Sequence, residues 1–158
     1  MIDIYKSPIG KIHLYSDGEK LVGLYFDKTD EPTGSDGVTE KTKQWLDEYF
    51  SGKIPSFLPD VQLSGTPFQR RVMEILLTIP YGEVMSYGEI AGIIAKEKGI
   101  EKMSARAVGQ AVGRNPISIL VPCHRVIGKN GSLVGYGGGM YRKVFLLDLE
   151  KKVKETIC

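Results

Sequence analysis

Apolar and polar positions alternate at the start of the chain in a way that predicts β-strands. Isoleucine and leucine alternate with polar neighbours over 2–4 and again over 12–14. A period of two residues turns one face of a strand toward a core. Asp17-Gly18 is a hairpin turn signal, and the apolar run 21–26 behind it is typical of a further strand.

The period then changes from two to that of a helix. After a polar loop over 27–39, Trp45, Leu46, Tyr49 and Phe50 fall at helical spacing. This spacing predicts an amphipathic helix over 39–51, with its aromatic stripe in the core. A proline-containing connector follows to Gly65 and is the best candidate for a domain boundary.

The second part of the chain begins with a clear helix start. Thr66 is a good N-cap, Pro67 suits the first helical position, and Gln69 completes a capping box. The apolar stripe of this helix stops at Pro80-Tyr81-Gly82.

Two short helices are predicted next. Ser86 opens one that runs through Ile94, a charged loop covers 96–102, and Ser104 caps the other over 105–112. Two short helices in succession, the second small and arginine-bearing, resemble a helix-turn-helix.

The remaining pattern combines a buried strand, a loop and a helix. Asn115-Pro116 ends the third helix, because the residue before a proline is pushed out of helical geometry. The run 117–121 is strand-like and apolar, a glycine-dense loop covers 128–139, and a final helix is expected over 141–154. Strands gathered at the start and helices after them predict an α+β fold.

Composition excludes several classes of protein. Of the 158 residues, 42% are apolar and 25% charged, the balance of an ordinary globular protein. No apolar run approaches the roughly 20 residues that span a bilayer, and the first residues do not resemble a signal peptide. Two cysteines, Cys123 and Cys158, are too few for a disulfide framework or a cysteine-rich zinc site. We therefore expect a protein of a reducing, intracellular compartment.

The net charge of +2 is unevenly distributed. Residues 1–64 carry 7 lysines against 11 acidic residues, whereas residues 65–158 carry 14 basic against 8 acidic residues. All six arginines lie in the second part. Such asymmetry indicates that one half meets a polyanion, although basic helical faces are often only solvated.

Cys123 and His124 form the only adjacent pair in the chain that can combine a nucleophile with its base. A thiolate is the reactive form of cysteine, and a nearby imidazole promotes it. Neighbours on an extended segment point to opposite faces, so a direct hydrogen bond between the two needs a bend or a bridging water. The structural alternative is a buried cysteine beside an exposed histidine.

Longer motifs resemble the O6-alkylguanine-DNA alkyltransferase family. The active-site signature of that family is similar to residues 115–126, which read Asn-Pro-Ile…Val-Pro-Cys-His-Arg-Val. Four further motifs follow the family's order over about residues 66–150, namely 81–91, 105–109, 135–139 and 143–150. The resemblance implies an RNase H-like support domain over 1–60 and a helix-turn-helix, DNA-binding and active-site domain over 66–155.

The resemblance also implies a reaction and its participants. Cys123 attacks the alkyl carbon of O6-alkylguanine by in-line displacement, and guanine leaves. His124 takes the thiol proton through a water, and Glu150 holds His124 in the useful tautomer. Asn115 braces the turn before the active site, and Tyr87 donates a hydrogen bond or a proton to the guanine ring. Nothing in the sequence offers a means of cleaving the thioether, so each molecule acts once.

Further residues are assigned to the base and to DNA by the same resemblance. The base pocket is expected to be lined by Val121, Val126, Tyr136 and Gly137. Contacts with DNA are expected from Gln69, Ala105, Arg106, Gly109 and Lys129. Arg106 fills the gap that the flipped nucleotide leaves, and small residues on its helix suit a narrow minor groove.

The implied partner is double-stranded DNA containing O6-alkylguanine, and the sequence leaves open whether O4-alkylthymine is also repaired. No cofactor is needed, because the alkylated base is itself the electrophile. His13 stands without the cysteines that zinc-binding members use, so no metal is expected. We expect a monomer with no membrane association, in the cytoplasm or, in a eukaryotic source, the nucleus.

Alternatives exist for single residues and for the whole chain. Arg106 can instead form a salt bridge with Glu97 or Glu101, and Glu150 can pair with Lys154 on its own helix. Tyr87 can be a core tyrosine. For the whole chain, one alternative is a damage sensor that binds lesions without transfer, but such proteins lack the reactive cysteine. The other is a cysteine hydrolase, which would need an oxyanion hole.

Overall fold

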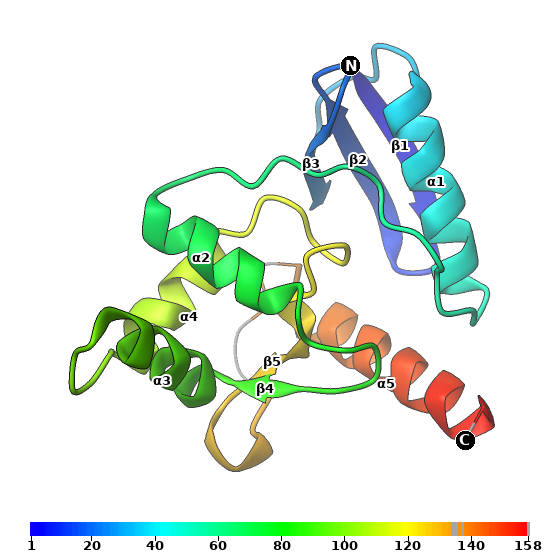
Figure 1. Ribbon diagram of the computed structural model, residues 1–158. Helices are drawn as coiled ribbons and strands as arrows, with labels where there is room; N and C mark the ends of the chain where they lie inside the picture. The colour runs from blue at the N-terminus through cyan, green and yellow to red at the C-terminus, as the bar shows by residue number, and fades with distance from the viewer. Residues whose placement is uncertain (134–135, 137, 158) are drawn as a thin grey trace.

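The fold was obtained as a computed structural model, which describes residues 1–133, 136 and 138–157. Its N-terminal part is a three-stranded antiparallel sheet in the order β1-β2-β3, with one helix packed along it (Figure 1). These elements are β1 (Ile2–Ser7), β2 (Gly10–Ser16), β3 (Leu21–Phe26) and α1 (Gly37–Phe50). The predicted strands are present, and Ile12 and Leu14 of the central strand are fully buried. The expected alternation of burial is not kept, because Asp3 and His13 are buried as well.

Helix α1 begins two residues earlier than the sequence pattern predicts. The carboxylate of Asp36 accepts a hydrogen bond from the backbone N–H of Thr39, while the Thr39 hydroxyl accepts one from the N–H of Asp36. This reciprocal cap starts the helix at Gly37 and was not identified from the sequence. Trp45 and Tyr49 lie buried in the core, as predicted.

The C-terminal part is mostly helical (Figure 1). Its elements are α2 (Pro67–Leu76), β4 (Met85–Ser86), α3 (Tyr87–Lys98), α4 (Ala105–Gly113), the 3-10 turn η1 (Cys123–Arg125), β5 (Val126–Ile127), the 3-10 turn η2 (Lys129–Gly131) and α5 (Met140–Ile157). β4 and β5 form a short parallel pair, which joins the start of α3 to the segment after η1. Helix α5 is longer than the predicted 141–154.

The predicted helix starts are confirmed. Thr66 and Gln69 form the expected reciprocal cap of α2, and the hydroxyls of Ser86 and Ser104 accept from the first turns of α3 and α4. The charged loop predicted over 96–102 is wrong in part, because α3 continues to Lys98. The helix ends where Gly99 adopts a left-handed conformation with a φ of 66°.

The strand predicted over 117–121 is also wrong. The Asn115 amide donates to the carbonyls of Ile117 and Val121, at 3.3 and 2.9 Å, and accepts from the N–H of Ile117 at 3.0 Å. These bonds close the segment into a turn, in which Ile119 has a φ of 70°. Only a single bridge, between Leu24 and Ile117, joins the segment to the sheet within the described residues.

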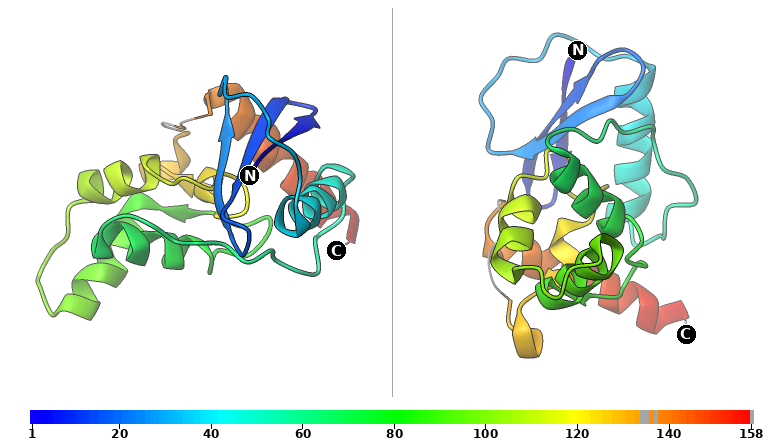
Figure 2. Two further views of the ribbon diagram at one scale, coloured as in Figure 1. Left: turned by 90° about the horizontal axis from the view of Figure 1, so that it is seen from above. Right: turned by 60° about the vertical axis from the view of Figure 1, so that its left-hand side comes forward.

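The two parts share one hydrophobic core. Figure 2 shows the sheet and α1 at one end of the molecule and helices α2–α4 at the other. Buried residues of the sheet, of α1, of the turn 117–121 and of the helices form a continuous cluster. The predicted α+β class is therefore confirmed, and the segment that carries Cys123 lies in the shared core.

Candidate active site

Cys123 lies at the start of η1 and is 7% exposed. The backbone here is a tight turn and not the extended segment that the sequence suggested, and the N–H of Cys123 donates to the carbonyl of Val121 at 2.8 Å. Burial raises the pKa of the Cys123 thiol, and interactions with Asn115, Lys143 and Tyr136 oppose that rise. The thiol is therefore protected from bulk water yet surrounded by groups that favour the thiolate.

His124 and Glu150 form a buried pair behind this turn. The distance from Nε2 of His124 to Oε2 of Glu150 is 2.6 Å, and the two residues are 0% and 1% exposed. Burial alone would raise the pKa of Glu150, but His124 and Arg125 outweigh it and bring that pKa to about 2. Burial lowers the pKa of His124 despite the opposing effect of Glu150.

These protonation states define the tautomer of His124. The ionised Glu150 can only accept, so Nε2 of the neutral imidazole carries the proton. Nδ1 is then an acceptor, and it is a buried atom without a hydrogen-bond partner among the described residues. The residue that follows Cys123 in the chain thus keeps a buried nitrogen that can accept a proton.

Arg125 and the backbone of Gly82 also donate to Glu150. Arg125 donates from Nε to Oε1 at 2.8 Å and from Nη2 to Oε2 at 3.2 Å, and its Nη1 bonds the carbonyl of Ile79 at 2.8 Å. The backbone N–H of Gly82 donates to Oε1 at 3.0 Å. Gly82 has a φ of 78°, and a Cβ there would lie 2.6 Å from the Lys154 side chain. The turn therefore requires a glycine.

Val121 and Val126 flank the Cys123 turn and are fully buried. The carbonyl of Val126 accepts a hydrogen bond at 2.6 Å from Nζ of Lys143, which is itself fully buried. Tyr136 interacts with Cys123, and burial raises the pKa of Tyr136 well above its usual range. The remaining residue of the expected base pocket, Gly137, lies outside the described residues.

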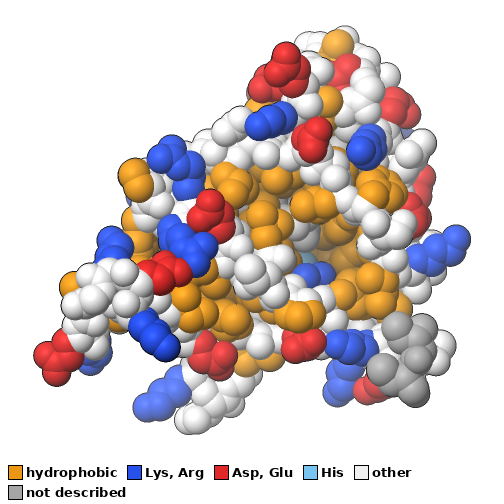
Figure 3. Space-filling model, in the orientation of Figure 1, with side chains coloured by type: hydrophobic (Ala, Val, Ile, Leu, Met, Phe, Trp, Pro, Cys, Tyr) orange, Lys and Arg blue, Asp and Glu red, His pale blue; other side chains and the backbone are white. Residues whose placement is uncertain are grey.

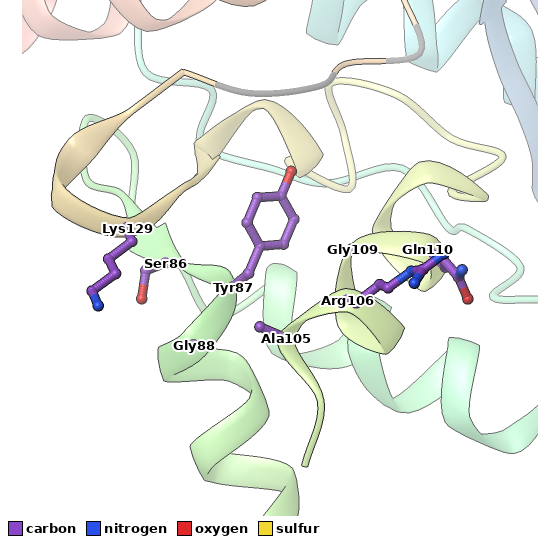
Figure 4. A pocket seen from close by; sticks show the side chains of 8 residues that line it. All are labelled: Ser86, Tyr87, Gly88, Ala105, Arg106, Gly109, Gln110 and Lys129. Carbon is purple, nitrogen blue, oxygen red and sulfur yellow. The ribbon is translucent and has the colours of Figure 1, made fainter.

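A cavity of about 760 Å³ lies between the starts of α3 and α4 and the turn η2. Its lining comprises Ser86, Tyr87, Gly88, Ala105, Arg106, Gly109, Gln110 and Lys129 (Figure 4). In Figure 4 the Tyr87 side chain rises from the start of α3, while Arg106 and Gln110 extend from α4. Burial and the nearby Cys123 raise the pKa of Tyr87, so its hydroxyl remains a proton donor.

Four of the five residues expected to contact DNA line this cavity, namely Ala105, Arg106, Gly109 and Lys129. Gln69 does not. Its side-chain oxygen accepts from the N–H of Thr66 at 3.0 Å, and it lines a smaller cavity of about 170 Å³ beside α4. Arg106 is exposed, and Glu97, one of its alternative partners, instead pairs with Arg71.

A second cavity of about 370 Å³ borders the segment around Cys123 at Pro122 and Arg125. Figure 3 shows it as a hollow bordered by hydrophobic side chains between the sheet end and the helical end. Trp45, Tyr81, Pro122 and Arg125 are among its lining residues. Of these two cavities, only the first is lined by residues that are expected to contact DNA.

Three residues of the site escaped the sequence analysis, which assigned them no role: Tyr49, Arg125 and Lys143. Lys143, Leu146 and Glu150 follow one another at helical spacing on α5, and all three are buried. A charged residue on the buried face of a helix, one turn from Leu146 and two from Glu150, is a signal that could have revealed Lys143. Tyr49 had no such signal, because a buried tyrosine in an aromatic stripe resembles ordinary core.

No group of three or more His, Cys, Asp or Glu side chains that could hold a metal ion occurs in the described ranges. Among the same residues, no helix is long and apolar enough to cross a membrane.

Two sequence-family models match almost the whole chain. The ribonuclease-like domain of 6-O-methylguanine DNA methyltransferase matches residues 2–63, and the DNA binding domain of the same family matches residues 67–152. The matched ranges therefore meet in the connector between α1 and α2.

Individual relatives agree with the family models. The methylated-DNA–protein-cysteine methyltransferase of Mycobacterium leprae is 48% identical over 151 residues, 92% of this chain and 88% of the relative. That of Methanosarcina acetivorans is 45% identical over 156 residues, 93% of this chain and 96% of the relative.

Among solved structures, Mycobacterium tuberculosis OGT in complex with DNA is similar, with 46% identity and a TM-score of 0.83 over 95% of this chain and 92% of that chain. The predicted fold class, with its ribonuclease-like and DNA-binding halves, is thereby confirmed. On these matches the chain belongs to the 6-O-methylguanine DNA methyltransferase family.

Proposed function

We propose that this protein repairs O6-alkylguanine in duplex DNA by moving the alkyl group to the sulfur of its own Cys123. The observation that carries the proposal is a set of three buried groups, namely the thiol of Cys123, the neutral imidazole of His124 and the ionised carboxylate of Glu150. A family that transfers methyl groups from DNA to a protein cysteine needs one activated thiol, and Cys123 is the only cysteine among the described residues.

The reaction has a simple electron balance. The thiol proton passes through a water to Nδ1 of His124, whose Nε2 proton stays hydrogen-bonded to Glu150. The thiolate attacks the alkyl carbon, an S–C bond forms, and the O6–C bond breaks with its electron pair going to guanine. Tyr87 donates to the ring as negative charge develops. A thioether is not reversed by these groups, so one molecule removes one alkyl group.

Base flipping brings the alkyl carbon within reach of the sulfur of Cys123. A stacked guanine cannot bring its alkyl carbon to a buried sulfur, so the nucleotide must leave the helix. We assign Val121, Val126 and Tyr136 to the pocket that receives the base, and Arg106 to the gap left in the duplex. The exposure of Arg106 and the position of Ala105, Gly109 and Lys129 around one cavity support these assignments.

We also propose the division of the chain into a support domain over 1–60 and a DNA-binding, catalytic domain over 66–155. The two family matches, 2–63 and 67–152, support this division. We also propose that the protein acts as a monomer. A DNA substrate implies the compartment that holds the DNA, which is the cytoplasm or, in a eukaryotic source, the nucleus.

The test is the mass of the intact protein after mixing with duplex DNA that contains one O6-methylguanine. Gain of one methyl group, mapped to Cys123 and stopping at one per molecule, is the expected result. Cys123→Ala should bind the same duplex without gaining mass, and Cys158→Ala should still gain it. Tight binding of the unaltered protein without a mass change would instead identify a damage sensor.

A further inference from the structure

The carboxylate of Glu150 accepts five hydrogen bonds, and one of them comes from the N-terminal part of the molecule. Oε1 accepts from Gly82 N–H and Arg125 Nε, and Oε2 accepts from His124 Nε2, Arg125 Nη2 and the hydroxyl of Tyr49. The Tyr49 hydroxyl lies 2.6 Å from Oε2, as close as the imidazole of His124. Tyr49 and His124 therefore share one oxygen.

Tyr49 is held rigidly in place. It is 0% exposed, its ring stacks on Trp45 with centroids 5.2 Å apart, and Phe50 and Tyr81 meet it edge to face. Burial and the adjacent Glu150 raise the pKa of Tyr49 well above its usual range, so the hydroxyl is a donor at every working pH. A buried donor that is always protonated gives Oε2 a fixed hydrogen bond.

We propose that Tyr49 is a positioning residue of the transfer reaction, acting on His124 through Glu150. By donating to Oε2, its hydroxyl weakens the electrostatic effect of the carboxylate on the imidazole. The same bond keeps the carboxylate oriented toward Nε2. His124 then stays neutral and able to take the thiol proton. The inference rests on the proposed function and assigns the N-terminal part a share in the chemistry.

Other groups facing the pair remain in place when the Tyr49 hydroxyl is removed. They are Arg125 of η1, Lys143 of α5 and Tyr81 of the turn before β4. Arg125 and Lys143 both lower the pKa of His124, whereas Glu150 raises it. Removing Tyr49 alone therefore strengthens the one interaction that favours the imidazolium.

The test compares the unaltered protein with Tyr49→Phe and with Tyr5→Phe as a matched control. Tyr5 of β1 donates at 2.7 Å to the carboxylate of Asp47, which lies on the same helix as Tyr49. Its variant therefore also removes one tyrosine-to-carboxylate bond, but not one to Glu150. Single-turnover methyl transfer is measured from pH 5 to 9 with saturating O6-methylguanine duplex. Affinity for the duplex and thermal unfolding are measured in parallel.

We expect the acidic limb of the Tyr49→Phe rate profile to move to higher pH by roughly half to one unit, because one charge-assisted hydrogen bond is lost. Well below the midpoint of that limb, transfer should be roughly three- to tenfold slower than in the unaltered protein, and at alkaline pH the two rates should converge. DNA affinity should not change. Tyr5→Phe should keep the unaltered profile even where its melting temperature falls.

A spectroscopic readout separates this role from a structural one. The chain has two histidines, so the Nε2 proton of His124 can be assigned by comparison with His13→Gln. With less competition for Oε2, that proton should move downfield in Tyr49→Phe and stay in place in Tyr5→Phe. If Tyr49→Phe does not fold, 3-fluorotyrosine at position 49 keeps the shape and donates more strongly, so both shifts should reverse.

The outcomes distinguish the inference from the function on which it rests. Absence of transfer by the unaltered protein would overturn the proposed function. Transfer by the unaltered protein together with an identical pH profile and His124 resonance in Tyr49→Phe would overturn the positioning role alone. A uniform loss of rate at every pH, matched by Tyr5→Phe, would also overturn it.

Discussion

The ammonium group of Lys143 lies 2.6 Å from the carbonyl oxygen of Val126, and both residues are fully buried. Burial lowers the pKa of Lys143, and the neighbouring Cys123 opposes this. Burying a cation costs free energy unless the charge is paired with an anion or hydrogen-bonded. The position of Lys143 on α5 allows its charge to favour the Cys123 thiolate.

Lys143→Met should therefore slow methyl transfer by roughly tenfold at neutral pH, because losing the cation raises the pKa of the thiol. The rate should keep rising toward alkaline pH, where the thiolate forms without help. Single-turnover rates across pH measure this. Lys151→Met, an exposed lysine on the same helix, is the control. A Lys143→Met profile of unchanged shape would contradict the role.

Glu150 should control how the protein responds to acid. Its pKa is about 2 in the folded state, below the ordinary value near 4.3 of an unfolded chain. The stabilisation from this difference, about 3 kcal/mol, is present above roughly pH 4 and is lost as pH falls toward 2. Urea unfolding of Glu150→Gln should show a flatter dependence on pH over that window.

The same variant should be less stable at neutral pH, since Arg125 would be left buried without its anion. Breaking a buried ion pair costs about 3–5 kcal/mol. Glu83→Gln is the control, because Glu83 is exposed and pairs only with Lys154 among the described residues. Equal acid sensitivity in Glu150→Gln and the unaltered protein would show that other carboxylates dominate.

Asn115 should affect stability and transfer together. Its amide makes three hydrogen bonds that close the turn before Cys123. Asn115→Ala leaves the buried N–H of Ile117 without a partner, whereas the carbonyls of Ile117 and Val121 each keep one backbone donor. A loss of about 1–3 kcal/mol is therefore expected in the free energy of unfolding. Methyl transfer should slow more than DNA binding weakens. Transfer at the normal rate would mean that the turn holds its shape without the amide.

Arg142 should hold the sheet to the catalytic helix. It is 5% exposed, forms two hydrogen bonds with the Asp27 carboxylate at 2.6 and 3.0 Å, and bonds the carbonyls of Ile9 and Gly138. Arg142→Met should lower the free energy of unfolding by about 2–4 kcal/mol, because both carbonyls lose their donor.

Asp27→Asn should cost less in the same denaturation experiment, since the Asp27 side chain is 70% exposed and the amide still offers an oxygen. An equal cost for the two variants would indicate that the ion pair, and not the carbonyl contacts of Arg142, carries the stabilisation.

Local chemistry explains what the sequence predicted well. Thr66, Ser86 and Ser104 cap their helices as their residue types predict, because capping depends on atoms within three positions. The strands at the start were predicted because one face of each must be buried. Glu150 was identified as a partner of His124 through family resemblance, and the 2.6 Å contact agrees with that assignment.

Features that depend on distant contacts were missed. The run 117–121 has the composition of a strand, but the Asn115 amide satisfies its backbone groups locally and turns it. Tyr49 and Glu150 are 101 residues apart, so no pattern within one element links them. The buried charge of Lys143 was missed because helical periodicity predicts an apolar residue there.

The hydrogen bonds of Glu150 also determine when the site can form during folding. Its partners are separated from it by 25, 26, 68 and 101 residues of chain. Long-range contacts of this kind are closed late, after the loop entropy between them has been lost. On a ribosome the sheet and α1 are synthesised first. The hydroxyl of Tyr49 therefore has no Glu150 to bind until α5 has been synthesised. Maturation of the nucleophile's surroundings is therefore a late event in the synthesis of each molecule.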